Sequence, residues 1–228
     1  MHYFFLGSRN ILLKVVEVSR KIQDRIIFER VSLSASKGEL TTITGPSGSG
    51  KTTLLRCIMG IDQPDSGTIS LAGEVFSSYP TRQRREFRLK NIGVVDQENR
   101  LIEDLNCRDN IRLIAEMSGG GRKQSFDTSK RILERLNMEE YGNRYPGSLS
   151  GGERQRISIG CALANTPSII AADEPTSSLD DEAADTVLHL FLDLARQFQI
   201  PVLLVTHDYR VRNYASAEYN FGRFGVPR

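Results

Sequence analysis

A glycine-rich segment that ends in Lys and Thr has the residue types and spacing of a phosphate-binding loop. It matches G-x-x-x-x-G-K-[ST] at every fixed position and reads Gly45, Pro46, Ser47, Gly48, Ser49, Gly50, Lys51, Thr52, then Thr53. Glycines let successive backbone N–H groups face phosphate oxygens, and a helix beginning here directs its positive end at the same anion. Lys51 would contact the β- and γ-phosphates, and the Thr52 hydroxyl would bind Mg²⁺. The alternative is a Gly/Ser-rich loop with an incidental Lys.

A pair of acids follows the apolar run Ile169–Ala172. If the chain hydrolyses a nucleotide, Asp173 would hold Mg²⁺ through a water and Glu174 would take the proton from the attacking water. Two acids after a strand can also cap the next helix. Pro175-Thr176 separates them from the helix expected over 181–198, and Ser178 or Asp180 suits that capping role better.

The segment Leu149-Ser150-Gly151-Gly152-Glu153 predicts a second anion site. A Ser-Gly-Gly turn before a helix offers free N–H groups, a hydroxyl and the positive end of the helix dipole. Two phosphate-binding helix starts in one chain make sense if two copies pack head to tail, each completing the other's site. An ordinary Ser N-cap without a ligand is the alternative.

The chain resembles the ATP-binding subunit of ABC transporters. The motifs that carry this resemblance follow one another along the sequence in the family's order: the phosphate loop, Gln97, the LSGGE segment, Asp173-Glu174, Asp180 and His207. The resemblance implies that Gln97 contacts Mg²⁺ and senses a membrane partner. It also implies that Asp180 links the two sites of a dimer and that His207 holds the γ-phosphate and water. Alone, Gln97 would be an ordinary loop residue and His207 a satisfied core residue.

One position departs from the family pattern. The family usually stacks adenine on an aromatic residue upstream of the phosphate loop, and Ile22 stands there. An aliphatic contact holds a base less firmly than an aromatic ring does. Tyr3, Phe4 or Phe5 are alternative partners for adenine. Within the family, the turn at Pro64–Gly67 and Arg88 resemble the lipoprotein-release, macrolide-export and cell-division branch.

Strands that alternate with helices predict an α/β fold with a mostly parallel sheet. The buried strands are expected at 40–44, 92–95, 169–172 and 202–206, and further strand pieces at 11–18, 26–28, 31–33 and 68–71. The resemblance implies a P-loop NTPase (RecA-like) core, an N-terminal antiparallel β subdomain and an inserted helical subdomain. We expect residues 1–228 to form one domain, with the core over about 1–97 and 154–228 and the helical subdomain over about 98–153.

Composition narrows the classes of protein. Apolar residues make up 39% and charged residues 25%, which suits a folded core, and the net charge of +2 gives no reason to expect nucleic-acid binding. No apolar run is long enough to cross a bilayer. The three cysteines are far apart, which favours reduced thiols. The basic run over 82–90 predicts a solvated helix face, with a partner-binding patch as the alternative.

We therefore expect an ATPase that uses ATP and Mg²⁺ to power a separate integral-membrane permease. It would act as a homodimer or paired cassette, peripheral on the cytoplasmic face of the inner membrane. One alternative is a soluble ABC-type ATPase acting on DNA or ribosomes, which usually carries a long coiled coil, tandem cassettes or a basic linker. A binding-only cassette is a second alternative, which the presence of Glu174 and His207 disfavours.

Overall fold

A five-stranded parallel sheet carries most of the predicted site residues at the ends of its strands. The computed structural model describes residues 10–222. Every pairing in this sheet is parallel. Its strands lie in the order β6 (Ile92–Val95), β7 (Ile169–Asp173), β8 (Val202–Val205), β3 (Leu40–Thr44) and β9 (Ala217–Asn220). The strands β3 and β8 are buried at every position, which explains why they are continuous runs of apolar and β-branched residues.

A second, antiparallel sheet lies beside the first. Its strands are in the order β2 (Arg25–Ser36), β1 (Ile11–Ile22), β4 (Ser66–Leu71) and β5 (Glu74–Val75). The strand pieces expected at 26–28 and 31–33 are one strand, β2, paired with β1 in a tight hairpin. In β1, Leu13 and Val15 are buried, and Val18 is buried after an irregularity in the strand register, so one face of this sheet packs on the core.

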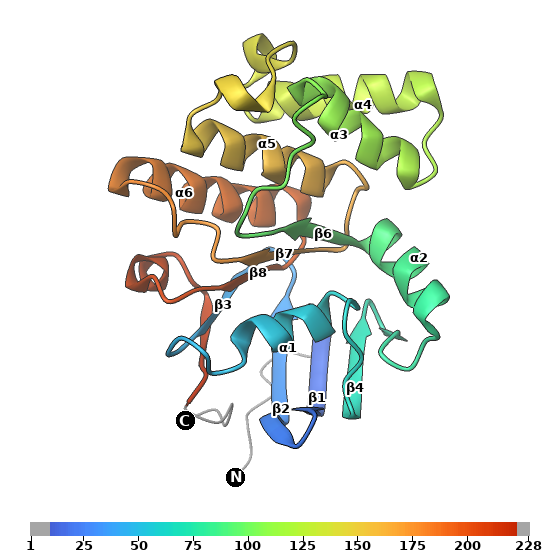
Figure 1. Ribbon diagram of the computed structural model, residues 1–228, viewed down its shortest axis with the longest axis vertical. Helices are drawn as coiled ribbons and strands as arrows, with labels where there is room; N and C mark the ends of the chain where they lie inside the picture. The colour runs from blue at the N-terminus through green and yellow to red at the C-terminus, as the bar shows by residue number, and fades with distance from the viewer. Residues whose placement is uncertain (1–9, 223–228) are drawn as a thin grey trace.

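The helices form two layers around the parallel sheet (Figure 1). Helix α1 (Lys51–Ile58) lies between the two sheets, and α5 (Gly151–Leu163) and α6 (Asp181–Phe198) cover the opposite face. Side chains of β7 alternate between the two cores. Ile169 and Ala171 pack in the core with α1, and Ile170 and Ala172 in the core with α5 and α6. Together these layers confirm the predicted α/β class.

The helices α3 (Cys107–Met117) and α4 (Arg122–Arg135) form the outer part of a helical lobe, followed by the short turns η1 (Glu139–Tyr141) and η2 (Pro146–Ser148). The predicted apolar stripe of α4, Ile132 and Leu133 with Leu136, is buried in the same core as α5. The subdomain boundary expected near residue 154 falls inside α5, so that division stays a prediction.

The basic run forms α2 (Thr81–Asn91), but the expectation of a fully solvated face is wrong at Arg84. This side chain is 5% exposed, and its Nε donates to the Gly60 carbonyl at 3.1 Å. Arg88 Nη1 donates to the same oxygen at 3.1 Å. Gly60 follows α1, and carbonyls at the end of a helix lack intrahelical donors. The two arginines supply those donors.

Two other composition-based expectations concern thiols and membrane spans. All three cysteines are free thiols, and burial raises the pKa of Cys57 to about 12. Within residues 10–222, no helix has both the length and the apolar character needed to cross a bilayer.

Candidate functional site

The predicted phosphate loop lines a cavity of about 770 Å³ together with residues from distant parts of the chain. Gln97 comes from the segment after β6, Glu174 from the end of β7, and His207 from the segment after β8. Because these strands are parallel neighbours, their carboxyl ends meet at one edge of the sheet. The structure thus brings together loop residues 45–53 and the three predicted polar side chains.

Close packing fixes the shape of the phosphate loop. A Cβ at Gly45 would lie 2.3 Å from the Phe221 carbonyl oxygen, and one at Gly50 would lie 2.9 Å from Ile27 Cγ2. Gly50 also has a φ of 101°, which side chains disfavour. The Lys51 side chain folds back, and its Nζ donates to the Gly45 and Pro46 carbonyls at 2.9 Å each. Burial lowers the pKa of Lys51, against the raising effect of Glu174 and Asp173.

Hard oxygen atoms suited to a magnesium ion meet at the start of α1. Thr52 Oγ1 donates to Asp173 Oδ1 at 3.2 Å, which places a hydroxyl beside a carboxylate. Thr52 and Gln97 line the phosphate-loop cavity, and Asp173 is not among its lining residues. Burial raises the pKa of Asp173. No group of three or more His, Cys, Asp or Glu within residues 10–222 could hold a metal alone. One carboxylate, a hydroxyl and substrate phosphates are a donor set that Mg²⁺ accepts.

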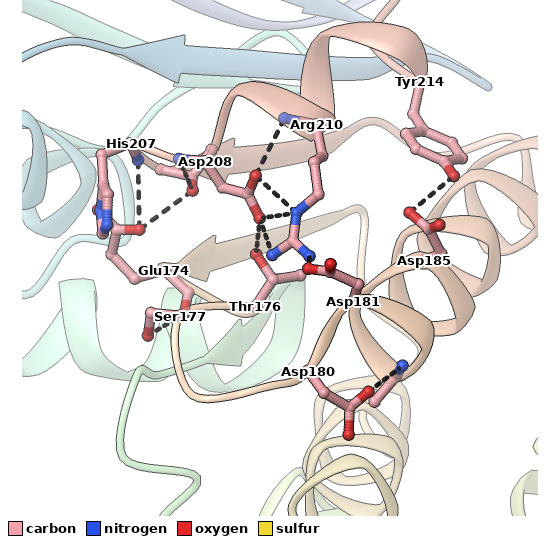
Figure 2. Close-up of polar contacts among 12 residues, drawn as sticks. Glu174, Thr176, Ser177, Asp180, Asp181, Asp185, His207, Asp208, Arg210 and Tyr214 are labelled. Atoms are coloured by element: carbon pink, nitrogen blue, oxygen red, sulfur yellow. Dashed lines mark hydrogen bonds and ion pairs between the residues drawn. The ribbon is translucent and has the colours of Figure 1, made fainter.

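The Glu174 carboxylate is held beside His207 (Figure 2). Its Oε1 lies 2.8 Å from His207 Nδ1, and its Oε2 accepts from Thr206 Oγ1 at 3.0 Å. The Glu174 backbone has a φ of 47°, which is uncommon outside glycine. Its carbonyl accepts from both the N–H and the hydroxyl of Ser177, and its own N–H donates to Val205 O. This arrangement suits a carboxylate that accepts a proton from a nearby water.

The Ser-Gly-Gly segment lines a separate surface pocket of about 380 Å³. Ser150, Gly151 and Gly152 face Asp180 and neighbouring residues there, and none of the pocket's lining residues belongs to the phosphate-loop cavity. Ser150 caps α5 in a capping box with Glu153, whose carboxylate accepts from the Ser150 N–H at 2.8 Å. Asp180 caps α6 and accepts from the Ala183 N–H at 2.8 Å. A single chain therefore presents two separate pockets, one at each of the two turns that the sequence predicts to bind phosphate.

Ile22 is not among the residues that line the phosphate-loop cavity. It is 46% exposed and pairs with Arg25 across the β1–β2 hairpin, while Arg25, Ile26 and Ile27 line the cavity. Sequence analysis did not predict these three residues. The signal for them was the short turn after Ile22, because so short a turn places the next strand, which begins at Arg25, directly beside β1. Adenine contact by Ile22 stays a prediction. Tyr3, Phe4 and Phe5 lie outside the described residues.

Comparisons with known proteins agree with this geometry. The ABC transporter family matches residues 28–177. The "Lipoprotein-releasing system ATP-binding protein LolD" of Buchnera aphidicola subsp. Acyrthosiphon pisum is 34% identical over 203 residues, covering 87% of this chain and 89% of that protein. The solved structure of dimeric MJ0796, a bacterial ABC transporter cassette, has a TM-score of 0.84 at 30% identity and covers 95% of this chain and 97% of its own.

A second structure, of the MJ0796 dimer in a post-hydrolysis state bound to ADP and Pi, has a TM-score of 0.81 at 29% identity and covers 92% of this chain and 94% of that one. The chain belongs to the ABC transporter family. It is an ATP-binding, ATP-hydrolysing transporter subunit with the P-loop fold that the motifs predict, and the relatives favour this function over the DNA- or ribosome-directed alternative.

Proposed function

We propose that two copies of this chain close head to tail around two Mg·ATP and thereby drive an integral-membrane permease. The observation that carries this proposal is the separation of the two half-sites. The loop at Lys51 and the capped turn at Ser150 are both suited to phosphate, yet they line different pockets. A twofold arrangement lets each copy's turn complete the other copy's cavity. The dimeric state of MJ0796 supports this reading.

Within each composite site, the chain's own groups bind and orient ATP. The loop N–H groups and Lys51 hold the phosphates, and Ser150, Gly151 and Gly152 of the second copy approach the γ-phosphate. Thr52, Asp173 and Gln97 would hold Mg²⁺, which neutralises phosphate charge when bound. Glu174 accepts the proton of the attacking water, and His207 and Thr206 keep that carboxylate in place.

A groove beside the segment that leads to Gln97 is the docking site we propose for the permease. Its volume is about 360 Å³, and it lies between α2, β6, α3 and α5. Its lining combines apolar side chains with basic ones and includes Leu89, Ile114, Met117, Arg85 and Arg88. Met117 is 56% exposed. The strand β6 lines the groove and leads directly to Gln97. A movement of the Gln97 segment would therefore be transmitted through β6 to a permease segment bound in the groove.

The same proposal predicts where the protein lies relative to the membrane and which class of permease it binds. A subunit that docks on a permease is peripheral on the cytoplasmic face of the inner membrane. The LolD relative is covered almost from end to end and has "lipoprotein-releasing" in its name. That match supports a permease of the lipoprotein-releasing kind as the partner.

Co-purification from membranes tests the proposal. Tagged protein extracted in mild detergent should carry an integral-membrane protein that mass spectrometry identifies. Met117→Asp should reduce that recovery severalfold. Phe126→Asp changes a comparably exposed apolar residue of the same lobe, outside the groove, and should not. Recovery of only nucleic acid or ribosomes would overturn the transport proposal.

A further inference from the structure

Arg210 joins two acidic residues that belong to different parts of the site (Figure 2). It lies in the short turn η3 (Tyr209–Asn213), and its Nε donates to both carboxylate oxygens of Asp208 at 2.9 and 3.0 Å. Its Nη2 donates to Asp208 Oδ2 at 2.7 Å, and its Nη1 donates to Asp181 Oδ1. A planar guanidinium offers donors on more than one edge and so binds two carboxylates at once, whereas the three donors of a lysine ammonium come from a single nitrogen and lack this fork.

One end of this cluster reaches the catalytic carboxylate. The Asp208 N–H donates to Thr206 Oγ1 at 2.9 Å, and that hydroxyl donates to Glu174 Oε2 at 3.0 Å. Asp208 Oδ2 also accepts from Thr176 Oγ1 at 3.0 Å, in the segment that follows Glu174. The Asp208 side chain is 10% exposed, so its position is set by these bonds. The Thr206 hydroxyl therefore links Glu174 to Asp208, and Asp208 is in turn bound to Arg210.

The other end reaches the second half-site. Asp181 is the first residue of α6 and follows Asp180, the cap of that helix. Asp180, Leu179 and Ser178 line the pocket that also contains the Ser150 turn. An unbroken series of hydrogen bonds and adjacent residues thus runs from the chain's own ATP cavity to the surface that serves the other copy's ATP.

We propose that Arg210 is a positioning residue that couples the two ATP sites of the dimer through its bridge to Asp181. The inference rests on the proposed head-to-tail dimer. When the γ-phosphate leaves one site, the displacement of Glu174 passes through Asp208 and Arg210 to the start of α6. It then alters the surface that Asp180 presents to the other site. Hydrolysis at the two sites is cooperative for this reason.

The free energy expected for each contact of Arg210 distinguishes a role in coupling the two ATP sites from a contribution to the stability of the fold. The Asp181 side chain is almost fully exposed, and exposed ion pairs contribute about 0–1 kcal/mol to stability. Loss of this bridge therefore changes the folded state little. The enclosed pairing of Arg210 with Asp208 is the stronger contact, because the arginine side chain is 24% exposed and binds that carboxylate with several donors. Asp181→Asn consequently removes the ionic part of the bridge and leaves the catalytic end in place.

The ATP dependence of phosphate release by the purified protein tests the inference. Two coupled sites allow a Hill coefficient of up to about 2 in the wild type. We expect Asp181→Asn and Arg210→Lys to bring it close to 1, and Asp181→Glu to recover most of the difference. The Kd for ATP should stay within twofold. Asp185→Asn removes a charge from the same helix, where Asp185 accepts from the Tyr214 hydroxyl, and should keep the wild-type coefficient.

Two outcomes would overturn the coupling. One is a wild-type Hill coefficient near 1, and the other is a coefficient that Asp181→Asn leaves unchanged. Size-exclusion chromatography with ATP in a Glu174→Gln background distinguishes this failure from failure of the proposed function. If that protein stays monomeric, the dimer itself is wrong. If it dimerises and the coefficient is unaffected, only the role of Arg210 is wrong.

Discussion

His207 Nδ1 lies 2.8 Å from Glu174 Oε1, which joins the ends of two neighbouring parallel strands through their functional side chains. The Glu174 side chain is 13% exposed and that of His207 is 67% exposed. The imidazole thus covers a carboxylate that is otherwise enclosed by protein. This contact connects the proposed proton acceptor, Glu174, to the residue expected beside the γ-phosphate, His207.

Replacement of the Glu174 carboxylate by an amide should stop turnover without preventing ATP binding. Glu174→Gln keeps the shape of the side chain but removes the charge that accepts a proton. We expect steady-state phosphate release to fall about 10²–10⁴-fold, while ATP still binds and dimers accumulate. Phosphate release and light scattering measure these two effects. Near-normal release by this variant would remove Glu174 from its role.

The Ser150 turn should be needed for turnover but not for ATP binding by a single chain. Ser150→Ala removes an N-cap, which costs about 0.5–2 kcal/mol of stability. Asn106→Ala removes the equivalent cap of α3 and serves as the control for that loss. We expect only Ser150→Ala to reduce ATPase activity at least tenfold at equal folded fraction. Full activity in a strictly monomeric sample of a Ser150 and Gly151 variant would contradict the shared site.

The pairing of Asp208 with Arg210 predicts a pH-dependent contribution to stability. Burial acts to raise the pKa of Asp208, but the hydrogen bonds from Arg210 and Thr176 and the charge of Arg210 together outweigh it, so the pKa lies below its ordinary value. A carboxylate with a lowered pKa in the folded state stabilises the protein above its unfolded pKa of about 3.9. That contribution disappears as the pH falls through the lower folded value.

Arg210→Gln should therefore be less stable than the wild type at pH 7, and the difference should shrink as the pH falls below about 4. Urea unfolding at a series of pH values measures this difference in the free energy of unfolding. Arg212→Gln is the control, because it removes a nearby arginine that binds Glu218 and leaves Asp208 paired with Arg210. A difference between wild type and Arg210→Gln that is constant down to pH 3 would contradict the assignment.

An aromatic residue near the hairpin should tighten nucleotide binding if it faces the base. Stacking of a base on an aromatic ring contributes about 1–3 kcal/mol. We expect Ile22→Tyr to lower the Kd for ATP, and Ile26→Tyr is the informative comparison because Ile26 lines the cavity. Inorganic triphosphate is the control ligand and should bind all variants equally. An unchanged Kd for Ile22→Tyr would mean that Ile22 does not face the base.

The features that could be predicted from the sequence are those that depend on residues close together along the chain. The phosphate loop, the acids after β7 and the capped Ser150 turn each depend on residues adjacent in the sequence. The strands that lead into the first two, β3 and β7, are short runs of β-branched and apolar residues. The role of Arg84 could not be predicted, because it depends on a contact with Gly60 in a different helix–turn segment. The Arg210 bridge to Asp181 joins positions 29 residues apart and depends on how α6 starts relative to η3.

The order of strands in the parallel sheet has a consequence for how the chain is made on the ribosome. β3 emerges early during synthesis, but both of its neighbours, β8 and β9, are translated last. Until they emerge, the β3 segment lacks the neighbour that each of its two edges pairs with in the folded sheet. A product truncated before residue 202 would therefore leave β3 without either neighbouring strand, and its unpaired edges would be open to aggregation.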